Sequence, residues 1–235
     1  MADSRMTDSR LIAAGIPGDM PVERFRYIVI EGPIGAGKTS LAKKLALDFD
    51  SNLLLEQAED NPFLANFYKN PRQYALSTQL HFLLQRAQQV QDFRQADLFH
   101  GSHIADFMID KDPLFAQITL NSDEFKLYQQ FYAHLTLDAP RPDLVIYLQA
   151  PLATLRERIA QRGIGYEQQI RDEYLLRLSE SYTRFFHDYD GNALLTVNTE
   201  SVDLINNAED YQAILEKIND IRSGRHYFNQ SSFAL

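Results

Sequence analysis

Apolar runs and amphipathic stretches alternate along the chain, and this alternation predicts its secondary structure. Short apolar runs are typical of strands buried in a parallel sheet, and longer stretches with apolar residues three or four positions apart are typical of helices. The predicted strands cover residues 26–31, 52–56, 97–106, 143–150 and 193–199. The predicted helices cover residues 38–49, 77–96, 124–138, 151–163, 171–189 and 208–221.

The order of these elements predicts the fold class. Strands that alternate with helices favour a parallel α/β sheet, because each helix carries the chain back to the start of the next strand. We therefore expect one doubly wound domain, with three α/β/α layers around a five-stranded parallel sheet. This domain should cover residues 26–221, between a flexible N-terminal arm at 1–25 and a C-terminal tail at 222–235. Ligands of such sheets bind at the carboxyl ends of the strands.

The helix predicted at 77–96 illustrates how a buried face is read from the pattern. Its apolar residues recur at helical spacing, so one stripe should face the rest of the domain. The residues expected on this buried stripe are Leu80, Leu83, Leu84, Ala87 and Val90.

The composition excludes several kinds of protein. The 235 residues include no cysteine, which excludes disulfides and thiolate metal sites. The formal net charge of −9 argues against a nucleic-acid-binding surface. No apolar run approaches the roughly 20 residues of a membrane-spanning helix, and the N-terminus lacks the apolar core of a secretory signal. We therefore expect a cytoplasmic protein that binds neither nucleic acid nor a membrane.

The segment GPIGAGKT, which starts at Gly32, contains the first candidate chemistry. It fits the phosphate-binding pattern G-x-x-x-x-G-K-[ST] between a predicted strand and a predicted helix. In such a loop, backbone N–H groups and the helix N-terminus hold phosphates, the lysine reaches the β- and γ-phosphates, and the hydroxyl ligates Mg²⁺. We therefore predict that the chain binds ATP and Mg²⁺. The expected nucleotide-binding residues are Gly32, Pro33, Ile34, Gly35, Ala36, Gly37, Lys38, Thr39 and Ser40.

A phosphate-binding loop alone leaves switch GTPases, motors and small-molecule kinases open. Segments 53–86, 103–117 and 155–170, and more loosely 188–203, resemble the deoxynucleoside kinase family, which includes deoxycytidine, deoxyguanosine and bacterial deoxyadenosine kinases. The stretches NPFLANFY and KDPLFA resemble the bacterial deoxyadenosine and deoxyguanosine kinases most. The resemblance implies a P-loop NTPase fold with a lid at about 158–168, and a homodimer. It also implies ATP-dependent phosphorylation of a deoxyribonucleoside 5′-hydroxyl in nucleotide salvage.

Glu56 ends the second predicted strand, and the resemblance implies that it is the general base that takes the proton of the nucleoside 5′-hydroxyl. The position is chemically reasonable, because phosphoryl transfer to a hydroxyl needs a proton acceptor near the γ-phosphate. A carboxylate at the carboxyl end of a strand also lies on the ligand-binding rim of the sheet. The alternative interpretation is a strand-end glutamate that faces solvent.

The resemblance assigns a second group of residues to the base of the nucleoside. Gln79 and Arg86 are seven positions apart, so they share one helix face with Phe82. A glutamine amide offers a donor and an acceptor side by side, which suits a base edge. Asp112 matches the aspartate that pairs with Arg86 and reads the base, and Phe115 matches an aromatic ring that stacks on it.

The sugar and the transferred phosphoryl group are assigned to the lid and its surroundings. Tyr68 and Glu167 match the residues that hold the sugar 3′-hydroxyl. Arg158 and Arg162 are four positions apart, so they project from one side of a helix. With Lys38 and Glu56, they are the expected catalytic residues, since lid arginines stabilise charge on the transferring group. Ile164 stands where members of the family often have a third arginine.

The segment around Asp106 both matches and departs from the family pattern. Asp106 matches the acidic residue that helps to hold Mg²⁺, so the expected metal ligands are Thr39 and Asp106. Phe107 and Met108 replace the arginine and serine that follow this acidic residue in the family. Lys111 is the nearest candidate for a substitute cation.

Two alternatives to a deoxynucleoside kinase remain open from the sequence. The missing cations at Phe107 and Ile164 would fit a catalytically weakened relative that acts as a nucleotide-binding sensor or subunit. A nucleoside-monophosphate kinase would also have a P-loop and lid arginines, but it needs further arginines for the phosphate of its acceptor. The acceptor side here offers chiefly acidic or neutral groups. The resemblance to the bacterial enzymes favours a purine deoxynucleoside as the substrate.

Overall fold

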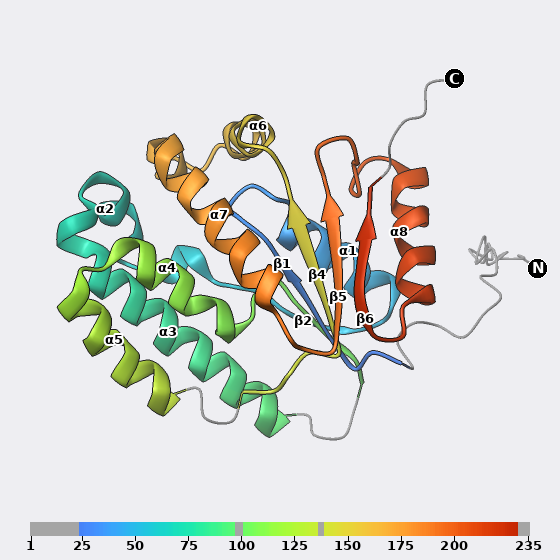
Figure 1. The fold of residues 1–235 in the computed structure, drawn as a ribbon, viewed down its shortest axis with the longest axis horizontal. Coiled ribbons are helices and arrows are strands. Elements are labelled where there is room, and N and C mark those ends of the chain that lie inside the picture. The colour runs from blue at the N-terminus through green and yellow to red at the C-terminus, as the bar shows by residue number, and fades with distance from the viewer. Residues whose placement is uncertain (1–23, 97–100, 136–138, 230–235) are drawn as a thin grey trace, which may run out of the picture.

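A parallel sheet of six strands runs through the computed structural model, which describes residues 24–96, 101–135 and 139–229. The strands follow the spatial order β2-β3-β1-β4-β5-β6 (Figure 1). In this register Ile28 of β1 lies opposite Ile104 of β3 and Leu144 of β4. The strands are β1 Tyr27–Glu31, β2 Asn52–Leu54, β3 His103–Ala105, β4 Leu144–Gln149, β5 Ala193–Asn198 and β6 Gly224–Phe228.

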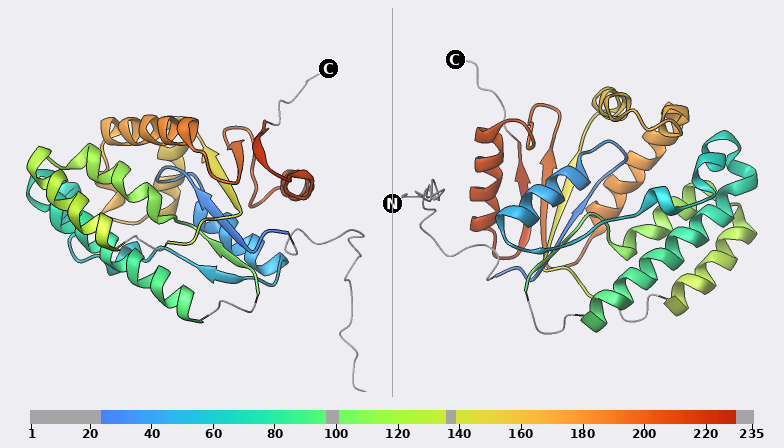
Figure 2. Two further views of the ribbon diagram at one scale, coloured as in Figure 1. Left: turned by 60° about the horizontal axis from the view of Figure 1, so that its bottom comes forward. Right: turned by 180° about the vertical axis from the view of Figure 1, so that it is seen from behind.

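Helices cover both faces of this sheet and extend beyond one of its edges. The helices are α1 Lys38–Asp48, α2 Leu64–Lys69, α3 Pro71–Ala96, α4 Asp112–Thr119, α5 Ser122–Leu135, α6 Leu152–Arg162, α7 Asp172–Asp188 and α8 Ala208–Asp220. Three short 3-10 helices are η2 Ala58–Asp60, η3 Ile109–Lys111 and η4 Glu167–Gln169. In Figures 1 and 2, α1 and α8 lie on one face of the sheet, α7 lies on the other, and α2 to α5 form a group beside it.

The central strand β1 is buried on both faces, which explains its continuous apolar run. Ile28 and Ile30 belong to the core cluster that contains side chains of α1 and α8. Tyr27 and Val29 belong to the opposite cluster, which contains Leu178, Tyr182 and Phe186 of α7. Since successive side chains of a strand point to opposite faces, one strand supplies both cores and fixes the loop that follows it.

The fold class predicted from the sequence is confirmed, although the sheet has six strands and not five. The sixth strand, β6, lies within the segment 222–235 that we expected to be a tail, and it pairs in parallel with β5. Its side chains are exposed or half-buried, as at a sheet edge, so no apolar run marks it. Residues 230–235 lie outside the described part of the chain.

The N-terminal boundary of the domain also differs slightly from the expected one. Phe25 is buried in the core, and the Arg24 guanidinium donates to the carbonyls of Asn219 and Ile221. The chain therefore joins the domain at Arg24, inside the expected arm at 1–25. The rest of that arm, residues 1–23, lies outside the described residues.

Two helices differ from the pattern predicted for them. Helix α3 begins at Pro71 and not at residue 77, because its first turn is polar and exposed and gives no apolar signal. On this helix Leu83 and Val90 are buried as expected, but Leu84 is 54% exposed, so its predicted inward position is wrong. The short helices α2 and α4 were not predicted. Residues 97–100 and 136–138, at the ends of a predicted strand and helix, lie outside the described residues.

Among the described residues, no helix combines the length and apolar character needed to cross a membrane.

Candidate active site

The loop between β1 and α1 is shaped by glycines at positions where a side chain would not fit. Gly35 has a φ of 87°, and a Cβ on it would lie 2.8 Å from the carbonyl oxygen of Leu155. Gly37 caps α1 with a φ of 98°, in the left-handed region that favours glycine. The loop therefore brings its backbone close to the start of α6 and places the N-terminus of α1 at the carboxyl edge of the sheet, where phosphates bind readily.

Asp106, directly after β3, connects this loop to the next strand end. Its carboxylate accepts a hydrogen bond from the Thr39 hydroxyl in the first turn of α1. The other carboxylate oxygen accepts from the backbone N–H of Glu56, at 2.7 Å. One buried side chain thus fixes the distance between the P-loop helix and the segment that carries Glu56.

Glu56 is held by two cations that come from different elements. The Arg86 guanidinium of α3 donates to Glu56 Oε1, with Nε at 2.9 Å, and the Lys111 Nζ of η3 lies 3.5 Å from the same oxygen. Burial opposes ionisation of this carboxyl, but Arg86, Lys111 and Lys38 outweigh it and hold its pKa well below the usual range. Hydrogen bonds from the described residues to the other oxygen, Oε2, are absent. Glu56 is thus an ionised carboxylate with one oxygen available.

Glu31, which sequence reasoning missed, is the second carboxylate of this cluster. It ends β1, its side chain is fully buried, and its Oε1 lies 3.4 Å from the Lys111 Nζ. Burial raises the pKa of Glu31, and the neighbouring Lys111 and Lys38 oppose this increase. The signal that pointed to Glu56, an acid at the carboxyl end of a predicted strand, was equally present at Glu31.

Most of the expected site residues line one cavity of about 760 Å³. Its wall joins the P-loop to α3, to the start of α4 and to the predicted lid segment, so the residues expected to bind the two substrates face one space. Asp112 lies behind the wall, buried and paired with Arg86. The expected residues on the wall are Ile34, Gly35, Lys38, Thr39, Ser40, Glu56, Tyr68, Gln79, Phe82, Arg86, Asp106, Phe115, Arg162 and Glu167.

The base-recognition residues predicted on α3 come together with Asp112. Gln79 and Arg86 are both buried, although most glutamines and arginines on helices are exposed. The Arg86 guanidinium lies 4.9 Å from the centre of the Phe82 ring, and it pairs with both Glu56 and Asp112. These contacts hold the Arg86 guanidinium in one arrangement on the cavity wall, which Gln79 also lines.

The predicted sugar-binding pair lies at the lid end of the same cavity. Tyr68 stacks on Tyr166, with ring centres 6.1 Å apart, and burial raises the pKa of its phenol, which keeps it protonated as a donor. Glu167 accepts hydrogen bonds from Arg162 at 2.7 and 2.9 Å. Tyr68 and Glu167 both line the cavity and offer it a phenol and a carboxylate, which are groups that can bind a hydroxyl.

The two arginines of the predicted lid lie in different surroundings. Arg162 lines the main cavity, whereas Arg158 donates to the Thr199 hydroxyl and carbonyl and to the Ala36 carbonyl. Arg158 lines a neighbouring cavity of about 800 Å³, which runs from the P-loop to the segment after β5. The structure therefore places both arginines beside the P-loop but does not bring Arg158 to Glu56.

The remaining residues singled out from the sequence lie in the P-loop, on the wall of the main cavity or in the core. Lys38 lines the main cavity, and its Nζ donates to the Pro33 carbonyl at 3.3 Å. Within the loop, the buried residues are Gly32, Pro33 and Ala36. Ile164 lines the main cavity, and Phe107 is fully buried. Within the described residues, no group of three or more His, Asp or Glu side chains could hold a metal ion by itself.

Comparison with known proteins decides the family. Residues 28–223 match the sequence model of the family described as deoxynucleoside kinase. The chain belongs to the deoxynucleoside kinase family.

Relatives of this deoxynucleoside kinase cover nearly the same length. The chain is 36% identical to the deoxyguanosine kinase of Bacillus subtilis over 83% of its own length and 97% of the relative's. It is 29% identical to a deoxyadenosine kinase of Lactobacillus acidophilus, over 83% and 95% of the two chains. The solved structure of a deoxyadenosine kinase from M. mycoides with bound dATP matches with a TM-score of 0.72 and 25% identity, over 82% and 99%. The protein is therefore a kinase with the P-loop fold.

Proposed function

We propose that this kinase transfers the γ-phosphoryl group of ATP to the 5′-hydroxyl of a purine deoxyribonucleoside in nucleotide salvage. The single observation that carries the proposal is the shared cavity, in which Glu56 faces the P-loop residues Lys38 and Thr39. A phosphoryl donor held at the loop and an alcohol held near Glu56 would meet within it. Its relatives, named for deoxyguanosine and deoxyadenosine, support the purine preference.

In the proposed reaction Glu56 accepts the proton of the attacking hydroxyl. Its low pKa makes it a weak base, but phosphoryl transfer through a loose transition state needs little deprotonation before the attack. The carboxylate can therefore act mainly by accepting a hydrogen bond through Oε2, which aligns the alcohol oxygen with the γ-phosphate. As the P–O bond forms, the hydroxyl proton moves to Glu56 and the β-phosphate oxygen of ADP leaves.

On the donor side, the residues present fit Mg²⁺. The Thr39 hydroxyl and the Asp106 carboxylate lie within hydrogen-bond distance of each other beside the loop, and both are hard oxygen ligands. Two protein ligands suit Mg²⁺, which takes most of its remaining ligands from phosphates and water. When bound, the ion would offset charge on the β- and γ-phosphates. Lys38 would contact the same phosphates, and the backbone N–H groups at the start of α1 would hold the triphosphate.

The segment at about 158–168 is the proposed lid. Arg162 and Arg158 would lie on the two sides of the transferring group, and closure would exclude water from it.

Tyr68 and Glu167 would bind the sugar 3′-hydroxyl. Gln79, with the Arg86–Asp112 pair, would read the base edge, and Phe82 and Phe115 would pack on its faces. We keep the cytoplasm as the proposed compartment, because the reaction consumes ATP.

The geometry argues against a nucleoside-monophosphate kinase. Such an enzyme needs arginines that are available to the acceptor's phosphate. The arginines that line this cavity, among the described residues, are Arg86, which is paired with Glu56, and Arg162, which the proposal assigns to the transferring phosphoryl group. A nucleoside with hydroxyls therefore fits the acceptor side better than a nucleotide does.

A panel of nucleosides tests the proposal. The purified enzyme is incubated with ATP, Mg²⁺ and each of deoxyguanosine, deoxyadenosine, deoxycytidine and thymidine, and ADP release and the 5′-monophosphate are measured. We expect the two purine deoxynucleosides to give the highest kcat/KM. Binding of nucleotide without turnover of any nucleoside would instead favour a sensor, and turnover of dGMP or dAMP in place of the nucleosides would favour a nucleoside-monophosphate kinase.

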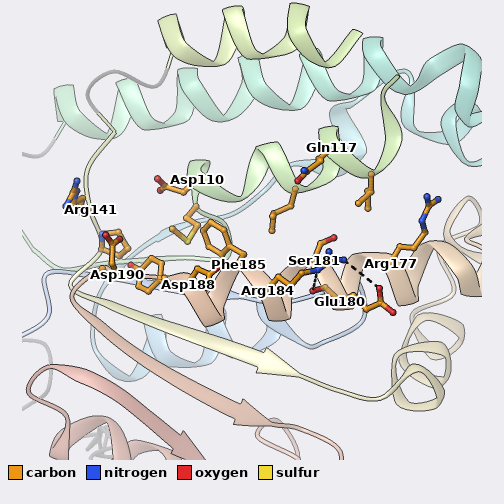
Figure 3. A pocket seen from close by; sticks show the side chains of 16 residues that line it. Asp110, Gln117, Arg141, Arg177, Glu180, Ser181, Arg184, Phe185, Asp188 and Asp190 are labelled. Carbon is orange, nitrogen blue, oxygen red and sulfur yellow. Dashed lines mark hydrogen bonds and ion pairs between the residues drawn. The ribbon is translucent and has the colours of Figure 1, made fainter. Parts of the chain in front are cut away.

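We also propose a homodimer, formed through the groove between α4 and α7. The groove, of about 810 Å³, has an apolar floor that includes Leu114, Ile118 and Phe185. Figure 3 shows charges of both signs around it, from Arg141, Arg177 and Arg184 and from Asp110, Glu180, Asp188 and Asp190. A twofold contact pairs a surface with itself, and a patch with both signs of charge can be self-complementary.

A further inference from the structure

A cation occupies the place next to Glu56 even though the family's arginine after Asp106 is missing. Phe107 stands at that position and is fully buried. The chain then turns through η3, and the next cation along it, Lys111, enters the site from the last residue of this turn. The Lys111 side chain is only 1% exposed, which is rare for a lysine without a specific partner.

Lys111 lies between the two strand-end glutamates. Its Nζ is 3.4 Å from Glu31 Oε1 and 3.5 Å from Glu56 Oε1, so one ammonium group is shared almost equally. Its Nζ also lies 5.8 Å from the centre of the Phe115 ring. A buried ammonium group is costly unless paired, and two carboxylates supply that pairing.

Glu31, which pairs with Lys111, is itself held by three hydrogen bonds. Its Oε1 accepts from the Met108 backbone N–H at 2.7 Å, which holds the start of the turn that carries Lys111. Its Oε2 accepts from the Tyr182 hydroxyl of α7 at 3.0 Å and from the Gly32 N–H at 3.3 Å. The same carboxylate is therefore bound to the P-loop, to α7 and to the Lys111 segment.

We propose that Lys111, held by Glu31, is a positioning residue that fixes the Glu56 carboxylate for phosphoryl transfer in place of the missing arginine. This inference rests on the proposed function. Arg86 on α3 and Lys111 on η3 both contact Glu56 Oε1. Because two elements hold this oxygen, the carboxylate cannot rotate freely and Oε2 points in one fixed direction.

The test compares Lys111→Met, which removes the charge, with Lys111→Arg, which keeps it. We expect Lys111→Met to lower kcat about 100-fold, as for loss of one oriented group in an active site. The KM for the nucleoside should change less than about threefold, because Lys111 acts through Glu56 and not on the base. Lys111→Arg should restore kcat to within about tenfold of the original enzyme. Lys126→Met, on the exposed face of α5, is the matched control and should leave kcat unchanged.

A double variant guards against misfolding. Lys111→Met leaves Glu31 buried without the cation that contacts it, so Glu31→Gln is added to remove that charge, and thermal unfolding is measured for each protein. We expect the double variant to unfold at a higher temperature than Lys111→Met while keeping its loss of kcat. If Lys111→Met or the double variant folds and keeps the kcat of the unsubstituted enzyme, the inference about Lys111 is wrong, while the proposed function stands. The same holds if Lys111→Arg and Lys111→Met lose kcat equally. An unsubstituted enzyme that phosphorylates no deoxynucleoside would overturn the proposed function itself.

Discussion

At the residue scale, the charges around Glu56 decide what this site can do. Four carboxylates, Glu31, Glu56, Asp106 and Asp112, meet three cations, Lys38, Arg86 and Lys111. Arg86 contacts Glu56 and Asp112, and Lys111 contacts Glu31 and Glu56. Such a network fixes geometry at the expense of stability, because burying charged groups is costly even when they are paired. This arrangement is typical of active sites, where function outweighs stability.

Replacing Glu56 tests its role as the proposed base. Glu56→Gln keeps the shape of the side chain but cannot take up a proton, so kcat should fall by about 10²–10⁴-fold. The KM for the nucleoside should change little, because the base and the sugar are held by other residues. Steady-state kinetics with the best purine deoxynucleoside measure both values. Glu216→Gln on the exposed side of α8 is the control, and near-normal turnover in Glu56→Gln would contradict the assignment.

The site residues could be predicted from the sequence to different extents. Glu56 and Asp106 are the last residues of predicted strands, and the parallel topology brings such positions to one edge. Their separation along the chain does not predict the hydrogen bond from the Glu56 N–H to Asp106. That bond depends on β2 and β3 being neighbours in the sheet. Lys111 could be proposed only as a nearby cation, because its entry into the site depends on the turn at η3.

At the element scale, the clearest patterns were predicted well and the weak ones were missed. Strand β4 and helices α1, α6 and α7 match their predicted ranges to within one residue at each end. Strand β6 was missed because GRHYF has few apolar residues and is stabilised by pairing with β5. Leu84 was assigned to the wrong face because α3 packs along Leu83 and Val90, which leaves the flank of the stripe in solvent.

Arg225 gives β6 a measurable role. Its guanidinium donates to the Phe186 carbonyl at 2.7 Å and the His187 carbonyl at 2.8 Å, and also to that of Tyr189, so it caps the end of α7. Arg225→Ala should lower the free energy of unfolding by about 1–2 kcal/mol, which corresponds to roughly 2–8 °C in Tm for a domain of this size. Calorimetry measures the change, with the exposed Arg72→Ala as control. An unchanged Tm would show that the cap contributes nothing.

At the scale of the whole molecule, two neighbouring cavities meet at the P-loop. The main cavity opens toward α2 to α4, and the neighbouring one runs toward the segment after β5. Arg162 and the P-loop residues Gly35 and Ser40 line both. This division matches the two substrates of the proposed reaction, and the α4–α7 groove lies apart from both cavities.

The proposed dimer predicts a mass of about twice the 27.1 kDa chain. Analytical ultracentrifugation at micromolar concentration should report this mass. Arg184→Glu reverses a charge that is 75% exposed in the groove, so it should weaken the dimer at least about tenfold. Arg72→Glu changes the charge equally outside the groove and should not. A sedimenting mass of one chain for the unsubstituted protein would contradict the proposal.

Asp106 has a consequence for engineering this enzyme. Because its two oxygens accept hydrogen bonds from Thr39 and from the Glu56 backbone, the proposed binding of the phosphate donor and the proposed alignment of the nucleoside both depend on this single side chain. Changes selected at the loop for a different phosphate donor would then combine non-additively with changes selected for a different nucleoside. The two specificities would have to be optimised together, in one library that varies both strand ends at once.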